Sequence, residues 1–215
     1  MKTFAIVPSK MFANAKTRLS AVLGSEDRIR LSSLMLQDTL SVLSSVRSLQ
    51  QIIVVSADRR AEELTTKSNA KFLYQRNDSG VNSAVMVADK YCIDHGADAT
   101  IVIPQDLPLL NAIDIERVCC LAENEKQCVV ICPSLRYDGT NLLLRKPPCV
   151  MRTFYDRDSY ITHVHAACGQ DIVVKLFVSK KIMTDIDTPE DMRQLASQSG
   201  LNGTTKFIKS LLCRS

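Results

Sequence analysis

Short runs of β-branched and aliphatic residues alternate along this chain with longer segments of helical periodicity. Phe4–Val7 and Ile52–Val55 are typical of the runs, and the segments between them repeat apolar residues every three to four positions. This alternation predicts an α/β fold, with a mostly parallel sheet and helices on both of its faces. The predicted strands are 4–7, 52–55, 71–74, 100–103, 129–131, 142–144, 150–153 and 172–178, and the predicted helices are 27–46, 61–67, 81–95, 112–123 and 160–168, with one more opening at Thr188.

The domain organisation is predicted to be simple. No long linker, low-complexity tract or internal repeat interrupts the 215 residues, a length that suits one large domain. We therefore expect a single domain over residues 1–215, with a loop near residue 200 and a short C-terminal helix over about 204–213.

Composition and spacing argue against several function classes. The net charge is only +4, no block of five like charges occurs and tryptophan is absent, so a nucleic-acid partner is not expected. The eight cysteines form no C-x-x-C pair, and we expect all of them to be reduced and structural. His163 and His165 cannot share one helical face as zinc ligands, and no G-x-S-x-G elbow indicates a catalytic serine.

The expected compartment is the cytoplasm. The apolar run near the N-terminus is too short for a signal peptide, and no stretch has the apolar length of a transmembrane helix. A membrane partner is therefore not expected, and a homodimer is left open.

Ligands of open α/β sheets bind beyond the carboxyl ends of the strands, so the segment after the first strand is informative. Pro8–Leu19 matches neither a G-x-G-x-x-G turn nor a phosphate loop, but it carries Lys10, Lys16 and Arg18. We expect a flexible loop whose cations could clamp a triphosphate. A solvated loop whose charges have no ligand is the alternative.

Carboxylates mark two further segments. Asp106 follows the predicted fourth strand, where it could hold a hard cation or merely order a turn before Pro108. Asp187 lies just outside a predicted helix cap, in which Thr188 and Asp191 form a pair resembling a capping box. Asp187 could then supply the second carboxylate of a Mg²⁺ site.

Taken together, the motifs resemble the family of 2-phospho-L-lactate guanylyltransferases and their phosphoenolpyruvate-using relatives, which make the guanylylated precursor of the deazaflavin coenzyme F(420). The resemblance extends from Phe4 to about Leu195. It rests on Ile6–Pro8 with Ala15–Ser20, Gly80–Ala84, Asp106–Leu109, Gly139–Asn141 and Asp185–Asp191, in that order.

The resemblance implies a glycosyltransferase-A-like, Rossmann-type nucleotidyltransferase sandwich with a mostly parallel mixed sheet. It also implies transfer of GMP from GTP to a small phosphorylated acid, namely 2-phospho-L-lactate or phosphoenolpyruvate, with Mg²⁺ as cofactor and pyrophosphate as product. The implied catalytic residues are Lys16, Arg18 and Asp106, the implied metal ligands are Asp106 and Asp187, and the implied nucleotide-binding residues are Pro8, Lys16, Arg18, Gly80, Asn82 and Asp106.

The implied acceptor-binding residues are Thr140, Asn141, Asp156 and Ser159, and here the chain departs from the family pattern. Asp156 replaces the glycine of the family's Phe-Gly-x-x-Ser-Phe segment, and a carboxylate there would repel an anionic acceptor unless Arg157 or a metal compensates its charge. Gln105 is a second departure, directly before Asp106. The sequence therefore leaves the acceptor open among 2-phospholactate, phosphoenolpyruvate and 3-phosphoglycerate.

Two other functions stay open on the sequence alone. A different nucleotidyltransferase of the same fold could act on a sugar phosphate or a molybdenum cofactor, but those enzymes carry a glycine-rich turn that this chain lacks. A non-catalytic nucleotide-binding module is the other alternative, against which the set of Lys16, Asp106 and Asp187 argues.

Overall fold

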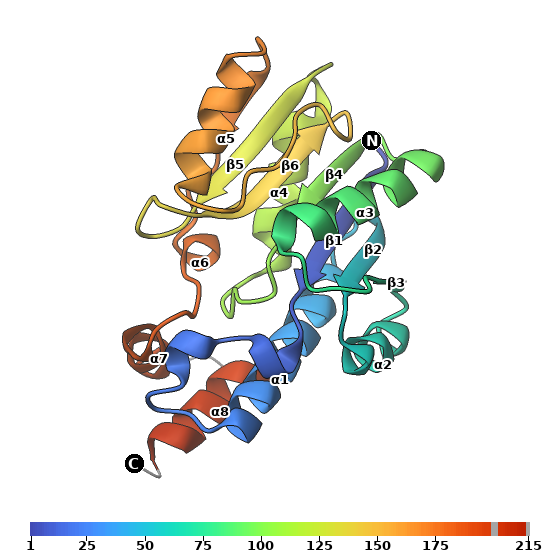
Figure 1. The fold of residues 1–215 in the computed structure, drawn as a ribbon. Coiled ribbons are helices and arrows are strands. Elements are labelled where there is room, and N and C mark those ends of the chain that lie inside the picture. The colour runs from blue at the N-terminus through green and yellow to red at the C-terminus, as the bar shows by residue number, and fades with distance from the viewer. Residues whose placement is uncertain (199–201, 214–215) are drawn as a thin grey trace.

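A seven-stranded mixed sheet runs through the centre of the computed structural model, which describes residues 1–198 and 202–213 (Figure 1). The strand order is β3-β2-β1-β4-β6-β5-β7, and only β6 runs antiparallel to its neighbours. The predicted α/β class with a mostly parallel mixed sheet is thus confirmed. The strands are β1 (Thr3–Ser9), β2 (Leu49–Ser56), β3 (Lys71–Tyr74), β4 (Ala99–Val102), β5 (Cys128–Pro133), β6 (Thr140–Lys146) and β7 (Val173–Leu176).

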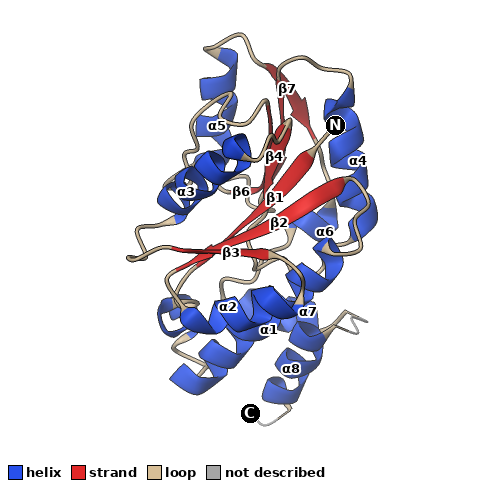
Figure 2. Ribbon diagram, turned by 90° about the vertical axis from the view of Figure 1, so that its right-hand side faces the viewer, coloured by secondary structure: helices blue, strands red, loops and turns tan. Residues whose placement is uncertain are grey.

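Helices cover both faces of the sheet, as Figure 2 shows. Because side chains alternate along a strand, Ala5 and Val7 pack on one face with α1, α2 and α4, whereas Phe4 and Ile6 pack on the other with α3. The helices are α1 (Ser25–Leu43), α2 (Arg59–Lys67), α3 (Val81–Asp94), α4 (Ala112–Glu123), α5 (Ser159–Cys168), α6 (Lys180–Met183), α7 (Pro189–Ala196) and α8 (Gly203–Leu212).

A second, smaller core lies beside the sheet, where α8 packs against both α1 and α7. The start of α7 matches the prediction: Thr188 accepts a hydrogen bond from the Asp191 amide, Asp191 accepts one from the Thr188 amide, and Pro189 is the first helical residue. This capping box fixes where the chain leaves the sheet and enters the helix. The predicted loop near residue 200 falls partly on 199–201, which lie outside the described residues.

One predicted strand is absent from the sheet, and one helix was not predicted. The segment Val150–Thr153 is a loop, because β6 lies between β4 and β5 and both of its hydrogen-bonding edges are taken. Its apolar residue Met151 packs into the core without joining the sheet. The short helix α6 was not predicted, since four residues are too few to display a period.

The segment after β1 is also more ordered than the predicted flexible loop. It forms two short 3-10 turns, Phe12–Asn14 and Thr17–Leu19, and the Phe12 ring is buried. The Phe12 amide donates to Asp58 Oδ2 at 2.9 Å, and Arg28 Nη1 donates to the Ala15 carbonyl at 3.3 Å. These contacts hold the backbone that carries Lys16.

All eight cysteines are free thiols. Four are buried, as small hydrophobic residues are, whereas Cys120, Cys149, Cys168 and Cys213 are exposed, and a structural role for these four stays a prediction. Within residues 1–198 and 202–213, none of the helices has both the length and the apolar character needed to cross a membrane.

Candidate active site

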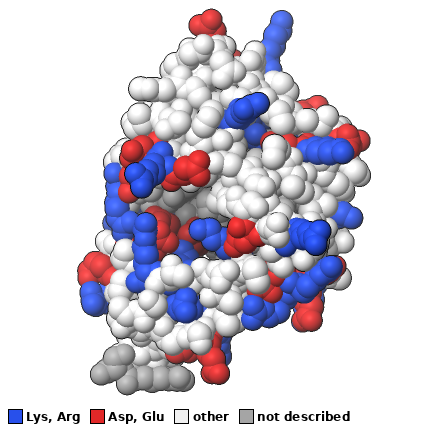
Figure 3. Space-filling view, in the orientation of Figure 1, with Lys and Arg blue, Asp and Glu red and all other residues white. Residues whose placement is uncertain are grey.

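A cleft of about 690 Å³ opens at the edge of the sheet where the parallel strands end. Its walls come from the turns after β1, the Pro104–Asp106 segment after β4 and the Asp156–Ser159 segment. Figure 3 shows the hollow with basic side chains (blue) and acidic side chains (red) around it. The cleft lies where the strand order reverses, between β1 and β4, which is the usual ligand position in open α/β sheets.

The antiparallel strand β6 brings its first residues to the same edge. Thr140 begins β6 and pairs with Pro133 at the carboxyl end of β5, so the start of β6 adjoins the ends of the parallel strands. The polar turn before β6 therefore lies at the same edge of the sheet as the residues that follow β1 and β4.

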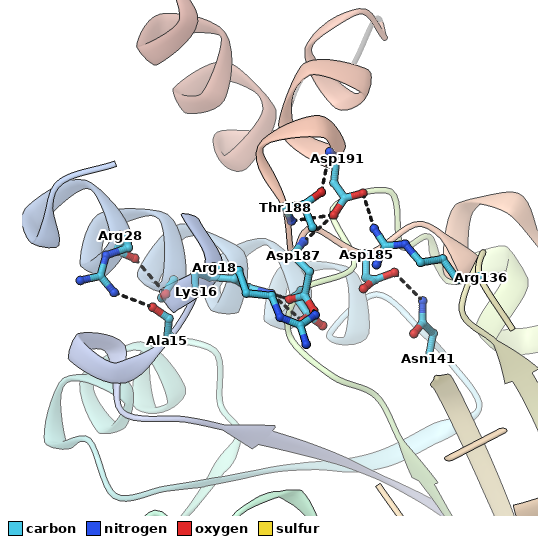
Figure 4. Close-up of polar contacts among 12 residues, drawn as sticks. Ala15, Lys16, Arg18, Arg28, Arg136, Asn141, Asp185, Asp187, Thr188 and Asp191 are labelled. Atoms are coloured by element: carbon cyan, nitrogen blue, oxygen red, sulfur yellow. Dashed lines mark hydrogen bonds and ion pairs between the residues drawn. The ribbon is translucent and has the colours of Figure 1, made fainter. Parts of the chain in front are cut away.

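Lys16 lies at the centre of an ionic cluster in the cleft (Figure 4). Its Nζ atom is 2.7 Å from Asp106 Oδ2 and 2.9 Å from Asp187 Oδ1, and Arg18 Nη1 is 3.2 Å from Asp187 Oδ2. The Lys16 backbone adopts φ 55°, an uncommon conformation for a residue with a side chain. Two carboxylates from distant parts of the chain thus converge on a single point.

The charges in this cluster shift two pKa values. Burial alone would lower the pKa of Lys16, but the negative charges of Asp106 and Asp187 outweigh it, and the pKa is raised. Burial, and then the charges of Asp106 and Asp187, raise the pKa of Asp185 to about 6. The site therefore holds a lysine that is cationic at pH 7 among crowded carboxylates.

Backbone hydrogen bonds near the second core hold Asp106, Asp185 and Asp187 in place. The Ile186 amide donates to the Asp106 carbonyl at 3.1 Å, so the two acidic segments lie side by side. Ile186 is buried, and its neighbours Asp185 and Asp187 both line the cleft, as alternation along an extended segment requires. The Asp187 amide donates to Asp191 Oδ2 at 2.9 Å, which ties the site to the cap of α7.

The other end of the cleft presents hydroxyl groups. The Thr140 amide donates to Ser159 Oγ at 2.8 Å, and Ser159 is the first residue of α5. Thr140 Oγ1 lies 2.9 Å from His163 Nδ1. The amides at the start of a helix favour negative charge, so this end of the cleft suits an anion.

The side-chain amide of Asn141 makes its contacts within the protein. Its Nδ2 donates to the Ile182 carbonyl at 2.9 Å and lies 3.5 Å from Asp185 Oδ1. The amide hydrogens of Asn141 therefore hold the end of α6 and the acidic segment next to β6. A direct contact between Asn141 and an acceptor stays a prediction.

Asn82 connects α3 to the segment that was predicted to bind the acceptor. Its Oδ1 accepts a hydrogen bond from the Tyr155 amide at 2.9 Å, and its Nδ2 donates to Asp156 Oδ2 at 3.2 Å. Among the described residues, Val81 lines the cleft, whereas its neighbours Gly80 and Asn82 do not. These contacts favour a role for Asn82 in positioning Tyr155 and Asp156.

For the guanylyl transfer that the resemblance implies, we expect Asn82→Ala to raise the Michaelis constant for the acceptor by about fivefold, because it removes two hydrogen bonds that hold the segment. The Michaelis constant for GTP should stay within about twofold of the wild-type value. Steady-state kinetics with each substrate varied in turn measures both constants. A larger effect on GTP would instead assign Asn82 to the nucleotide, as the resemblance implied.

Most residues predicted for the site are brought together. The cleft is lined by nine of them, which are Pro8, Lys16, Arg18, Asp106, Thr140, Asn141, Asp156, Ser159 and Asp187. Sequence reasoning did not assign Asp185, Arg136 or Arg157, which also line the cleft. The spacing of Asp185 and Asp187, two apart in a segment without helical period, was a signal that could have found Asp185.

The charge of the cleft is close to balanced. Five cationic residues and six aspartates line it, which gives a formal charge of −1. The described lining includes no histidine or cysteine. The cleft thus combines hydroxyl groups at one end with an ionic cluster of opposite charges at the other.

The family model and the curated relatives that match this chain are all described as guanylyl transferases. The model of a family described as "Guanylyl transferase CofC like" matches residues 3–214. The phosphoenolpyruvate guanylyltransferase of Rubrobacter xylanophilus is 32% identical over 94% of this chain and 97% of its own length. The 2-phospho-L-lactate guanylyltransferase of Methanothermobacter thermautotrophicus is 31% identical, with 98% and 92% covered.

A third relative, the 3-phospho-D-glycerate guanylyltransferase of Colwellia psychrerythraea, is 29% identical over 91% of this chain and 92% of its own. Among solved structures, one from Desulfovibrio desulfuricans is described as a "putative nucleotide-diphospho-sugar transferase". It superposes with a TM-score of 0.80 at 17% identity, and the match covers 100% of this chain and 98% of that one. At that identity the structural match supports the nucleotidyltransferase-like fold alone.

Proposed function

This chain belongs to the CofC-like guanylyl transferase family, and on that premise we propose that it joins GMP from GTP to a small phosphorylated carboxylic acid. The product would be a precursor of the coenzyme F(420), as the family implies. The eight free thiols favour the cytoplasm as the compartment of the protein. The observation that carries the proposal is the convergence of Asp106 and Asp187 on the Lys16 ammonium group.

The residues of this cluster fit a magnesium ion. Mg²⁺ is typically held by one or two carboxylates together with substrate phosphates and water, and Asp106 and Asp187 offer oxygens that already meet at one cation. Burial first, and then the negative charges of Asp106 and Asp187, raise the pKa of Asp185, and a divalent cation would relieve the second of these two effects. Bound there, Mg²⁺ would neutralise charge on the triphosphate and favour departure of pyrophosphate.

The remaining chemistry requires little from the protein beyond positioning. A phosphate oxygen of the acceptor attacks the α-phosphorus of GTP, the bond from that phosphorus to the bridging oxygen of pyrophosphate breaks, and a new P–O–P linkage forms. The attacking oxygen is already an anion at pH 7, so no general base is needed. Lys16 and Arg18 would reduce the repulsion between the two anions.

Release of pyrophosphate tests this function. The purified chain should release pyrophosphate only when GTP, Mg²⁺ and a phosphorylated acid are all present. A panel of 2-phospho-L-lactate, phosphoenolpyruvate and 3-phospho-D-glycerate identifies the acceptor, and ATP, CTP and UTP test the base. Release that does not depend on any of the three acids would contradict the proposal.

Asp156 should influence which acid is used. Its side chain is exposed at the rim of the cleft, and the partner that the structure describes for it is the neutral amide of Asn82. We expect Asp156→Gly to change the ratios of kcat/KM among the three acids by about fivefold or more, because it removes a negative charge near an anionic substrate. The Michaelis constant for GTP should change little.

Two control variants sharpen this test. Asp156→Asn removes the charge and keeps an oxygen for Asn82, so it should reproduce most of the change in ratios. Ser159→Ala should weaken the use of all three acids through the lost hydroxyl group, without changing their order. Unaltered ratios in Asp156→Gly would mean that Asp156 does not read the acceptor.

A further inference from the structure

A buried histidine lies directly beneath the hydroxyl end of the cleft. His163 has no exposed surface, and its two ring nitrogens have different partners. The Phe154 amide is 2.8 Å from Nε2, and Thr140 Oγ1 is 2.9 Å from Nδ1. The ring is packed against Tyr155 edge-on at 5.0 Å between centroids, which fixes its orientation.

The tautomer of His163 follows from its partners. A backbone N–H can only donate, so Nε2 of His163 must accept from Phe154 and carries no hydrogen. In the neutral ring the hydrogen is then on Nδ1, which donates to Thr140 Oγ1. Burial, together with the charge of Arg145, lowers the pKa of His163 to about 4, which is consistent with a neutral ring at pH 7.

The consequence reaches the cleft through Thr140. If Thr140 Oγ1 accepts from His163 Nδ1, its own hydrogen remains available for another acceptor, and Thr140 is one of the residues that line the cleft. Ser159 is in the same position, since its Oγ accepts from the Thr140 amide and Ser159 also lines the cleft. Both hydroxyl groups have an accepting side satisfied within the protein and a hydrogen left to donate.

We propose that His163 is a positioning residue that keeps the Thr140 hydroxyl as a hydrogen-bond donor toward an anionic oxygen of the acceptor. The proposal rests on the proposed function, and it adds a residue outside the cleft to the determinants of acceptor binding. A hydroxyl group held as a donor would favour a carboxylate or ionised phosphate oxygen, which can only accept.

The tautomer can be observed without any assay of activity. In ¹⁵N-labelled wild-type protein at pH 7, the nitrogen shifts and long-range couplings of the three histidines identify which ring nitrogen carries hydrogen. Assignment of His163 by comparison with His163→Asn should give a neutral ring with hydrogen on Nδ1. A hydrogen on Nε2, or on both nitrogens, would overturn the proposal even if the enzyme is active.

Two substitutions separate the two contacts of the ring. An asparagine amide reaches the position of Nδ1 and can still donate to Thr140, whereas a glutamine amide reaches the position of Nε2 and retains only the Phe154 contact. We expect His163→Gln to raise the Michaelis constant for the acceptor by about tenfold, with that for GTP within about twofold. His163→Asn should stay within about threefold of wild type for both.

A double-mutant cycle with Thr140→Val completes the test. If His163 acts through the Thr140 hydroxyl, His163→Gln should add less than about twofold to the acceptor defect of Thr140→Val. Equal defects in His163→Asn and His163→Gln, or additive effects with Thr140→Val, would reduce His163 to a packing role. Failure of the proposed function is distinguishable, because the wild type would then release no pyrophosphate with any acceptor.

Discussion

Asp106→Asn and Asp187→Asn are each expected to lower kcat by about 100-fold or more at 1 mM Mg²⁺, roughly 3 kcal/mol of transition-state stabilisation. Each substitution removes one of the two carboxylates that converge on the same point in the cleft. Part of the loss should be recovered at higher Mg²⁺ concentrations, because one ligand remains. Turnover measured across a Mg²⁺ titration gives both the size of the defect and the shift in metal dependence.

Asp138→Asn provides a matched control for the two metal variants. Asp138 also lines the cleft, but its Oδ1 accepts a hydrogen bond from the Ser134 hydroxyl at 2.8 Å, which an asparagine can also accept. The Asp138→Asn variant should keep kcat within about threefold of wild type, with an unchanged Mg²⁺ dependence. Near-normal turnover of either Asp106→Asn or Asp187→Asn at low Mg²⁺ would remove that residue from the proposed metal site.

Lys16→Ala should lower kcat/KM for GTP by about 10- to 100-fold, since a hydrogen bond to a charged group is worth about 1.5–3 kcal/mol. The lysine side chain is only 7% exposed and lies between two carboxylates, so its removal also leaves their repulsion uncompensated. Initial rates with GTP varied at a saturating acceptor concentration measure the effect.

Lys10→Ala is the control for Lys16→Ala. Lys10 lines the same cleft but is exposed, and it lies outside the ionic cluster. We expect its loss to cost less than about threefold in kcat/KM for GTP, as is typical of a solvated charge. If Lys10→Ala were the more damaging substitution, the triphosphate would bind nearer the tip of the loop than Lys16 implies.

Local patterns predicted most of the secondary structure. The strand Lys71–Tyr74 and the helix Ala112–Glu123 have the predicted bounds, and the cap at Thr188 follows from its own residue types. The segment Val150–Thr153 has the same apolar composition as a strand but finds no free edge of the sheet. Whether a run becomes a strand depends on neighbours that local composition does not encode.

The candidate site was predictable where it follows strand ends. Lys16 and Asp106 each follow a parallel strand, and their side chains meet at the switch point as that rule requires. The partner of Asn82 was not predictable, because it lies 73 residues away on a loop whose path depends on tertiary packing. His163 is a similar case, since its relation to Thr140 depends on β6 running antiparallel.

The central claim, transfer of GMP to a phosphorylated acid, is tested most directly by following the phosphorus atoms of GTP. GTP labelled at the α-phosphorus should yield a labelled product that forms only with the acceptor, whereas GTP labelled at the γ-phosphorus should yield labelled pyrophosphate. Label from the γ-position in the acceptor product, or α-label found only in GDP or GMP, would contradict guanylyl transfer and indicate phosphoryl transfer or hydrolysis instead.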